Sequence, residues 1–288
     1  MSEANHTKDA LLPAEMARVA ENIGVNKVSQ DIVKTFALAI LAGAFIAFGA
    51  IFSSLVITGS TLPFGITKLM GGLAFSLGLI LVVVGGAELF TGNNLITMAW
   101  AGRKVSFAKM MQNWLVVYLG NMLGAFSIVI LILLSGHPMM GDGLVGSKIL
   151  EIAQSKCQLG FTQAVVLGIL CNILVCLAIW LCYSARSTQG KILAIIFPIT
   201  AFVAAGFEHS VANMYFIPAG LLLKATAGQE FWGLIQSGPG MFPDLNWTRF
   251  IIYNLLPVSI GNIIGGAGFV GLAYWFIYLR KNSPKNQN

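Results

Sequence analysis

The chain has 288 residues, of which 57% are hydrophobic and only 10% are charged. A soluble domain of average composition carries about 25% charged residues. The composition therefore excludes a soluble globular enzyme, a disordered chain and a disulfide-rich secreted scaffold, and it predicts that most of the chain lies in a lipid bilayer. The net charge is +6. The Lys and Arg residues lie between apolar segments rather than in a basic cluster interleaved with aromatics, so we expect no nucleic-acid partner.

Residues 1–29 precede the first apolar segment and contain four acidic residues, so they do not resemble a secretory signal peptide. Four apolar residues there fall at the spacing of one helix face: Met16, Val19, Ala20 and Ile23. We expect a cytoplasmic amphipathic helix that either lies at the membrane interface or acts as a mobile gate. The chain is then divided into this helix (1–29), a pore domain (30–280) and a cytoplasmic tail (281–288).

A membrane span needs about 20 mostly apolar residues. Five segments meet this requirement directly: 35–57, 69–89, 114–134, 161–183 and 250–279. A sixth, 192–223, would form a single helix of about 48 Å at ~1.5 Å per residue, against a hydrocarbon core of about 30 Å, so we expect it to be broken at 206–210. The sequence thus predicts an all-α membrane protein with six transmembrane helices, and a short outer helix over 148–154 in the linker 137–158.

The positive charges predict the orientation. With six spans both termini lie on one side of the membrane, and that side carries twelve of the 17 Lys and Arg residues. Because loops rich in Lys and Arg stay in the cytoplasm, we expect a multi-pass protein with both termini cytoplasmic. The four cysteines show no metal-ligand spacing and are interpreted as small apolar packing residues, so we expect neither a metal nor another cofactor.

Two pairs of short matches indicate an internal repeat. The stretches 86–93 and 206–213 share Gly, Glu and Asn at the same spacing, and the stretches 120–124 and 261–265 share the pattern Gly-Asn-x-x-Gly. The matches fall on equivalent spans in the same order. Since an odd number of spans per half forces opposite orientations, they predict an inverted 3+3 repeat with broken helices 2 and 5.

The two stretches also carry the ionisable residues that we expect inside the membrane. Irregular backbone at that depth survives only when it is buried in protein or lines a wet cavity. We expect Glu88 and Glu208, together with Asn93 and Asn213, to hold their loops in shape, because free N–H groups there need acceptors. The alternative is a direct part for the two glutamates in proton transfer.

His209 stands where the first stretch has Leu89, so the repeated scaffold itself does not require an imidazole. Ionisable residues within membrane spans mark solute pathways. We therefore expect His209 to be a titratable group at the midpoint of a pathway; the alternative is a buried histidine bonded to a carbonyl.

Three longer motifs resemble one family. Residues 83–92 and 168–178 are similar to the two signatures of the formate/nitrite transporter family, and 206–214 resembles its broken fifth helix. The resemblance runs from about residue 11 to 280 and is strongest to the formate channels. It implies an aquaporin-like fold, a homopentamer in the bacterial inner membrane with one pore per protomer, and transport of formate. It also implies that the break in helix 2 gates the cytoplasmic side.

The resemblance further implies roles for pore residues. His209 would stand beside Thr91 at the centre, with Asn172 and Lys156 on the substrate pathway. The constriction residues would be Leu89, Phe90 and Phe202 on the cytoplasmic side and Phe75 and Leu79 on the outer side, with Val175 in the pore lining. A bare carboxylate is costly to bury, so apolar rings around one histidine that donates a proton or a charge-assisted hydrogen bond would suit formate, with pH-dependent flux.

Three other functions remain to be weighed. Nitrite or hydrosulfide could use the same fold, and no single residue separates these small anions from formate. A neutral-solute channel of aquaporin type is disfavoured because paired Asn-Pro-Ala motifs are absent. An intramembrane hydrolase using Ser210 and His209 is disfavoured because adjacent residues rarely orient as nucleophile and base, so we expect no enzyme.

Overall fold

The computed structural model describes residues 10–280, which form helices joined by turns and contain no β-strand, as the sequence predicted. Within this range five helices are long and apolar enough to cross a bilayer: α2 (Ile32–Ile57), α3 (Phe64–Gly85), α6 (Phe107–Leu134), α8 (Phe161–Ser184) and the continuous helix Arg249–Tyr278. Two shorter helices, α9 (Thr188–Ala204) and α10 (Ser210–Thr226), cover the remaining predicted segment.

Short elements connect these helices. Between α3 and α6 lie α4 (Phe90–Asn93), η1 (Asn94–Ile96) and α5 (Thr97–Ala101). The two linkers predicted to lie outside contain η2 (His137–Met139), α7 (Leu144–Cys157), α11 (Gln229–Leu234) and η3 (Pro239–Met241). The helix predicted over 148–154 is therefore longer than expected. The last long helix includes two π-helical stretches, η4 (Arg249–Leu255) and η5 (Ile264–Leu272), on either side of α12 (Leu256–Ile263), and it ends as α13 (Ala273–Tyr278).

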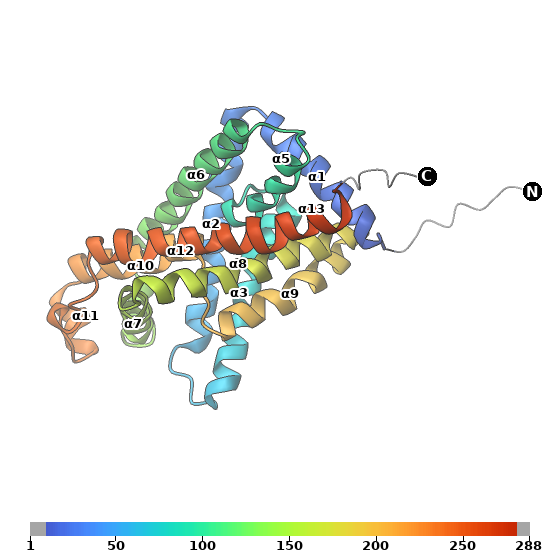
Figure 1. Ribbon diagram of the computed structural model, residues 1–288. Coiled ribbons are helices and arrows are strands. Elements are labelled where there is room, and N and C mark those ends of the chain that lie inside the picture. Colours follow the sequence, from blue (N-terminus) through green and yellow to red (C-terminus); the bar gives the residue numbers. More distant parts are fainter. Residues whose placement is uncertain (1–9, 281–288) are drawn as a thin grey trace, which may run out of the picture.

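Helix α1 (Pro13–Ser29) packs across one end of the long helices. Its first turn is fixed by Pro13 and by Glu15, whose Oε2 accepts the N–H of Leu12 at 2.9 Å. Met16 and Ala20 are buried, as the apolar face predicted, and this side of the helix contacts α5, α8 and α13. Figure 1 shows α1, α5 and α13 gathered at one end of the molecule, with α11 at the far end of the long C-terminal helix.

Glycines allow two pairs of long helices to approach closely. Helix α2 packs on α6, and α8 packs on α12. A Cβ on Gly124 would overlap the carbonyl oxygen of Ile40, and one on Gly265 would overlap that of Ile169. Both glycines belong to the Gly-Asn-x-x-Gly stretches, so the absence of a side chain brings the neighbouring Asn121 and Asn262 into the core of the protein.

Candidate functional site

The chain after α3 and the chain after α9 turn in the same way. Gly86 has φ +75° and Gly206 has φ +74°, a left-handed conformation that favours glycine. Each is followed by a residue whose N–H bonds five residues back, Ala87 to the oxygen of Val82 and Phe207 to that of Phe202. The two turns end α3 and α9 and lead into two loops, 86–89 and 205–209, whose last residues are buried.

The first loop is organised around Glu88, whose residue is 6% exposed. Its carboxylate accepts hydrogen bonds from Lys27 Nζ at 2.7 Å and from Asn93 Nδ2 at 2.7 Å, and its backbone N–H donates to the oxygen of Leu38. Asn93 Nδ2 also donates to Asn113 Oδ1 at 2.9 Å. The buried charge is therefore paired and hydrogen-bonded, which is the condition for keeping a carboxylate inside a protein.

The second loop repeats this arrangement around Glu208, whose residue is 5% exposed. Lys156 Nζ donates to its carboxylate at 2.8 Å and Asn213 Nδ2 donates at 2.6 Å, while the backbone N–H of Glu208 donates to the oxygen of Leu167. Asn213 Nδ2 also donates to Asn254 Oδ1 at 2.7 Å. Each contact has its counterpart in the first loop, with the same kinds of donor and acceptor.

The two asparagines of the glycine motifs complete the loops. Asn121 Oδ1 accepts the N–H of Phe90 at 2.9 Å, and its Nδ2 donates to the carbonyl oxygens of Ala39 and Glu88. The corresponding contacts of Asn262 have the same pattern, and they are made to the N–H of Ser210 and the oxygens of Gly168 and Glu208. A single side chain thus satisfies three backbone groups in each loop.

Thr91 and His209 meet where the two loops come together. Both are buried, at 0% and 3% exposed, and Thr91 Oγ1 lies 2.9 Å from His209 Nε2. His209 Nδ1 accepts the backbone N–H of Ala212 at 3.0 Å and caps α10. Since an amide N–H only donates, Nδ1 carries no proton in this geometry, and the neutral ring must carry its proton on Nε2. His209 therefore presents an N–H donor toward Thr91.

Asn172 lies beside this pair, but its amide nitrogen is occupied. Asn172 Nδ2 is within hydrogen-bonding distance of three oxygens: the carbonyl of Thr91 at 3.3 Å, Asn94 Oδ1 at 2.8 Å and the carbonyl of Asn262 at 2.7 Å. Its Oδ1 lies near Cys176 Sγ. In this arrangement Asn172 joins α8 to α4, η1 and α12, and its N–H groups are not directed at a solute.

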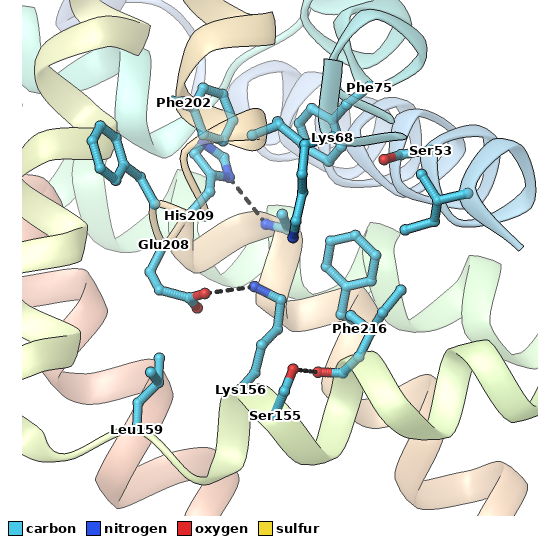
Figure 2. Close-up of a pocket in the computed structure, with 16 residues that line it drawn as sticks. Ser53, Lys68, Phe75, Ser155, Lys156, Leu159, Phe202, Glu208, His209 and Phe216 are labelled. Atoms are coloured by element: carbon cyan, nitrogen blue, oxygen red, sulfur yellow. Dashed lines mark hydrogen bonds and ion pairs between the residues drawn. The ribbon is translucent and has the colours of Figure 1, made fainter. Parts of the chain in front are cut away.

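A cavity of about 320 Å³ leads to His209 from the side that the sequence predicts to be outside, and we call it the outer cavity. Phe75, Phe202 and Phe216 line it, with Lys156 and Lys68 among the polar residues. The Phe75 and Phe202 rings lie edge to face at 5.7 Å between centroids, and Phe202 stacks on the His209 ring at 6.0 Å. Figure 2 shows Phe202 beside His209 and Lys156 directed at Glu208 across the cavity.

A cavity of about 180 Å³ lies on the other side of the loops, toward the predicted cytoplasmic side, and we call it the inner cavity. It is lined by Lys27, Glu88 and Leu89, with Tyr183 and Gly92. Both cavities thus contain one Lys–Glu ion pair, and the buried Thr91–His209 contact lies between the loops that form their inner walls.

Three residues with predicted constriction roles lie outside the two linings. Among the described residues, Phe90, Leu79 and Val175 are buried in the surrounding apolar core. The ring of Phe90 packs on Tyr118 at 4.8 Å and on Trp114 at 6.4 Å, so it points into α6. Its direction follows from the bond between its N–H and Asn121, which fixes the orientation of the first turn of α4.

Several residues of this arrangement were missed by the sequence reasoning. Asn113 and Asn254 each stand eight residues before the asparagine of a Gly-Asn-x-x-Gly stretch, so the repeat itself could have identified them. Lys27 stands eleven residues before Leu38, as Lys156 does before Leu167, but no motif around Lys27 marks this relation. Tyr118 and Ser259 also occupy related positions, and their hydroxyls bond to each other at 2.8 Å.

Comparisons with known proteins identify the family of the chain. A family model described as formate/nitrite transporter matches residues 14–276. The chain is 49% identical over 281 residues to the formate channel FocA of Escherichia coli (strain K12), covering 97% of this chain and 99% of that protein. It is 44% identical over 264 residues to the FocA channel of Haemophilus influenzae, covering 91% and 93%. A solved structure described as a pentameric formate channel with formate bound matches with a TM-score of 0.83 at 46% identity, covering 86% of this chain and 98% of that chain.

Proposed function

We propose that this chain, which belongs to the formate/nitrite transporter family, is a formate channel of the bacterial inner membrane that works as a homopentamer. The family match and the relatives confirm the family resemblance of the motifs, and the chain is a channel rather than an enzyme. The observation that carries the proposal is the buried Thr91–His209 pair between two cavities that each contain a Lys–Glu pair.

We propose six membrane spans with both termini cytoplasmic, and the division into 1–29, 30–280 and 281–288, of which 1–9 and 281–288 lie outside the described residues. Helix α3 with α4–α5 would form one broken span, and α9 with α10 the other. The matched hydrogen bonds of Glu88 and Glu208 support an inverted 3+3 repeat of aquaporin-like type. The bond between Tyr118 and Ser259 supports a two-fold axis passing between them, because related positions meet only at such an axis.

On this reading formate enters the outer cavity, where Lys156 raises the local concentration of anions. It then passes the Phe75 and Phe202 rings, which exclude larger solutes and a continuous file of water. The carboxylate next meets Thr91 and His209, and it leaves past Leu89 into the inner cavity beside Lys27. Phe90, Leu79 and Val175 support the walls of this route from behind.

His209 acts here as a hydrogen-bond donor. A neutral ring whose single proton is on Nε2 donates a hydrogen bond to a carboxylate, but giving that proton away would leave an imidazolate. Transfer of a proton to formate requires a second proton on Nδ1 first, and that proton would face the N–H of Ala212 at the positive end of α10. The geometry therefore favours donation of a hydrogen bond over donation of a proton.

The pH dependence of flux follows from the solute and from α1. The reference pKa of an α-carboxyl group is near 3.5, so the neutral acid becomes more abundant as the pH falls and burying the solute costs less. The contact between Lys27 and Glu88 connects α1 to the wall of the inner cavity. This connection supports a gating role for that helix at low pH.

The test is competitive flux through purified protein in liposomes, with formate, nitrite and hydrosulfide present in turn and internal pH recorded. A formate channel conducts formate, and an excess of formate slows the flux of the other anions. Conduction of nitrite or hydrosulfide with no measurable formate flux would contradict the proposed substrate.

A further inference from the structure

A third charged cavity, of about 660 Å³, lies away from the proposed pathway, where α1, α5 and α13 meet. Arg18 and Glu21 of α1 line it together with Arg103 and Lys104, which follow α5. Its apolar wall is formed by Trp275 and Leu279 at the C-terminal end of the last helix. We call this cavity the basic cavity.

The charges of the basic cavity do not cancel. Lys104 Nζ lies 2.5 Å from the Glu21 carboxylate, and the Glu21 residue is buried. Arg18 and Arg103 have no ion pair within residues 10–280, so three positive groups face one negative group. Glu21 is held against the backbone of Gly102, where a Cβ would overlap its Oε1. The lining of the cavity therefore carries a net positive charge.

Arg103 occupies a backbone conformation that arginine rarely adopts. Its φ is +58°, in the left-handed region, where glycine or asparagine fits the turn between α5 and α6 without strain. The turn is closed by bonds from the N–H of Arg103 to Trp100 and from that of Lys104 to Ala99. An arginine at such a position brings a planar guanidinium, which suits bidentate hydrogen bonds to a phosphate.

Aromatic residues at the same end of the molecule indicate the level in the membrane at which the cavity lies. At the same end of the molecule Trp180 stacks on Tyr274 at 4.1 Å, and Trp100 contacts Phe107 at 5.9 Å. Trp and Tyr gather at the level of the lipid headgroups. The excess of Lys and Arg assigns this end to the cytoplasm, where the leaflet contains anionic lipid.

We propose that the basic cavity binds the phosphate of an anionic phospholipid from the cytoplasmic leaflet. Arg18 and Arg103 donate to the phosphate oxygens, and Trp275 and Leu279 contact the glycerol and the first methylenes of the acyl chains. Lys104 remains paired with Glu21 and sets the position of the loop. The inference rests on the proposed orientation of the chain and is independent of which anion the pore conducts.

The experiment is native mass spectrometry of the full-length assembly in detergent, titrated with phosphatidylglycerol or phosphatidylcholine. The variant Arg18→Gln/Arg103→Asn removes both charges, and Asn retains the left-handed turn. The matched control, Lys34→Gln/Arg186→Gln, removes the same charge from two exposed positions that the sequence assigns to the same side. Formate flux in liposomes is measured for all three proteins, because neither pair lies on the proposed pathway.

We expect the wild type to prefer phosphatidylglycerol, the cavity variant to bind it roughly 30-fold more weakly, and the control to behave as the wild type. Intact assembly mass and formate flux show that the cavity variant is folded. Equal binding of the two lipids by the wild type, or equal losses in variant and control, would overturn the proposal. Displacement of the lipid by soluble glycerol phosphate would overturn its lipid source. Absence of formate flux through the wild type would count against the proposed substrate and would leave the lipid result standing.

Discussion

The loop that follows α3 and the loop that follows α9 have the same internal hydrogen bonds but present different side chains to each other. In both, a buried glutamate accepts hydrogen bonds from a lysine and an asparagine, and a second asparagine is hydrogen-bonded to three backbone groups. The related positions Leu89 and His209 differ, as do Thr91 and Val211. The repeated residues therefore build the loops, and the unrepeated polar residues, Thr91 and His209, form a polar contact where the loops meet.

The largest effect is expected from making the two loops alike. His209→Leu gives the second loop the residue that the first loop has at that position, and it removes the donor to the solute. We expect formate flux in liposomes to fall about 100-fold or more, since a carboxylate that lacks a hydrogen-bond donor is costly to bury. The assembly should stay intact, because loss of the cap on α10 costs only about 1 kcal/mol. Flux within about threefold of wild type would show that the imidazole is dispensable.

The glutamates should respond alike because they share a scaffold role. Glu208→Ala leaves Lys156 and Asn213 without their acceptor and should lower the stability of the folded protein by about 3 kcal/mol. Glu88→Ala should cost about 2 kcal/mol, because Lys27 is 23% exposed against 15% for Lys156 and regains water more easily.

The control for both is Glu151→Ala, which breaks an exposed ion pair with Lys148 and should change stability by less than about 0.5 kcal/mol. Denaturant unfolding of the purified protein in detergent gives all three values. A neutral result for Glu88→Ala beside a large loss for Glu208→Ala would show that only one loop depends on its buried acid.

A finer comparison uses the two central asparagines. Asn121→Ala and Asn262→Ala each leave two carbonyls and one N–H without a hydrogen-bond partner. Each should therefore lower the unfolding free energy by about 2 kcal/mol. The same unfolding measurement applies. If the two costs differ by more than about 1 kcal/mol, the loops are not held equivalently.

The smallest effect is expected from the lysines of the two cavities. Lys156→Gln should slow uptake from outside, and Lys27→Gln should slow efflux, each by about threefold to tenfold at low ionic strength. The difference in flux between each variant and the wild type should be smaller at 0.5 M salt, because salt screens the attraction between the lysine and the anion. Right-side-out membrane vesicles measure both directions, with Lys148→Gln as the control. Loss of flux in both directions for either variant would indicate a structural role instead of attraction of the anion.

Much of this arrangement was predictable because the repeat is visible in short motifs. Gly, Glu and Asn at matching spacings indicated two equivalent turns, and the structure gives Gly86 and Gly206 nearly the same φ. Lys27 was not found, because its role depends on how α1 packs across the end of the other helices. The direction of the Phe90 ring and the bonds of Asn172 also depend on tertiary contacts, which residue spacing does not encode.

Helix boundaries show the same division between local and tertiary signals. Hydropathy predicted that the third span begins at residue 114, whereas α6 begins at Phe107. The first turns of α6 include Lys109, Gln112 and Asn113, and they are stabilised by Ser106, whose Oγ accepts the N–H of Lys109. This N-cap is a local signal that an apolar window does not detect.

The central claim is that His209 serves as a neutral hydrogen-bond donor, and His209→Asn tests it most directly. Asparagine retains an N–H donor but does not accept and release protons in this pH range. The measurement is formate flux through His209→Asn in liposomes between pH 7 and pH 4, with internal pH recorded and His209→Leu as the reference. The account predicts clear flux through the Asn variant, at least about tenfold above the Leu variant. Flux as low as that of His209→Leu over the whole range would contradict it and would favour a proton relay through His209.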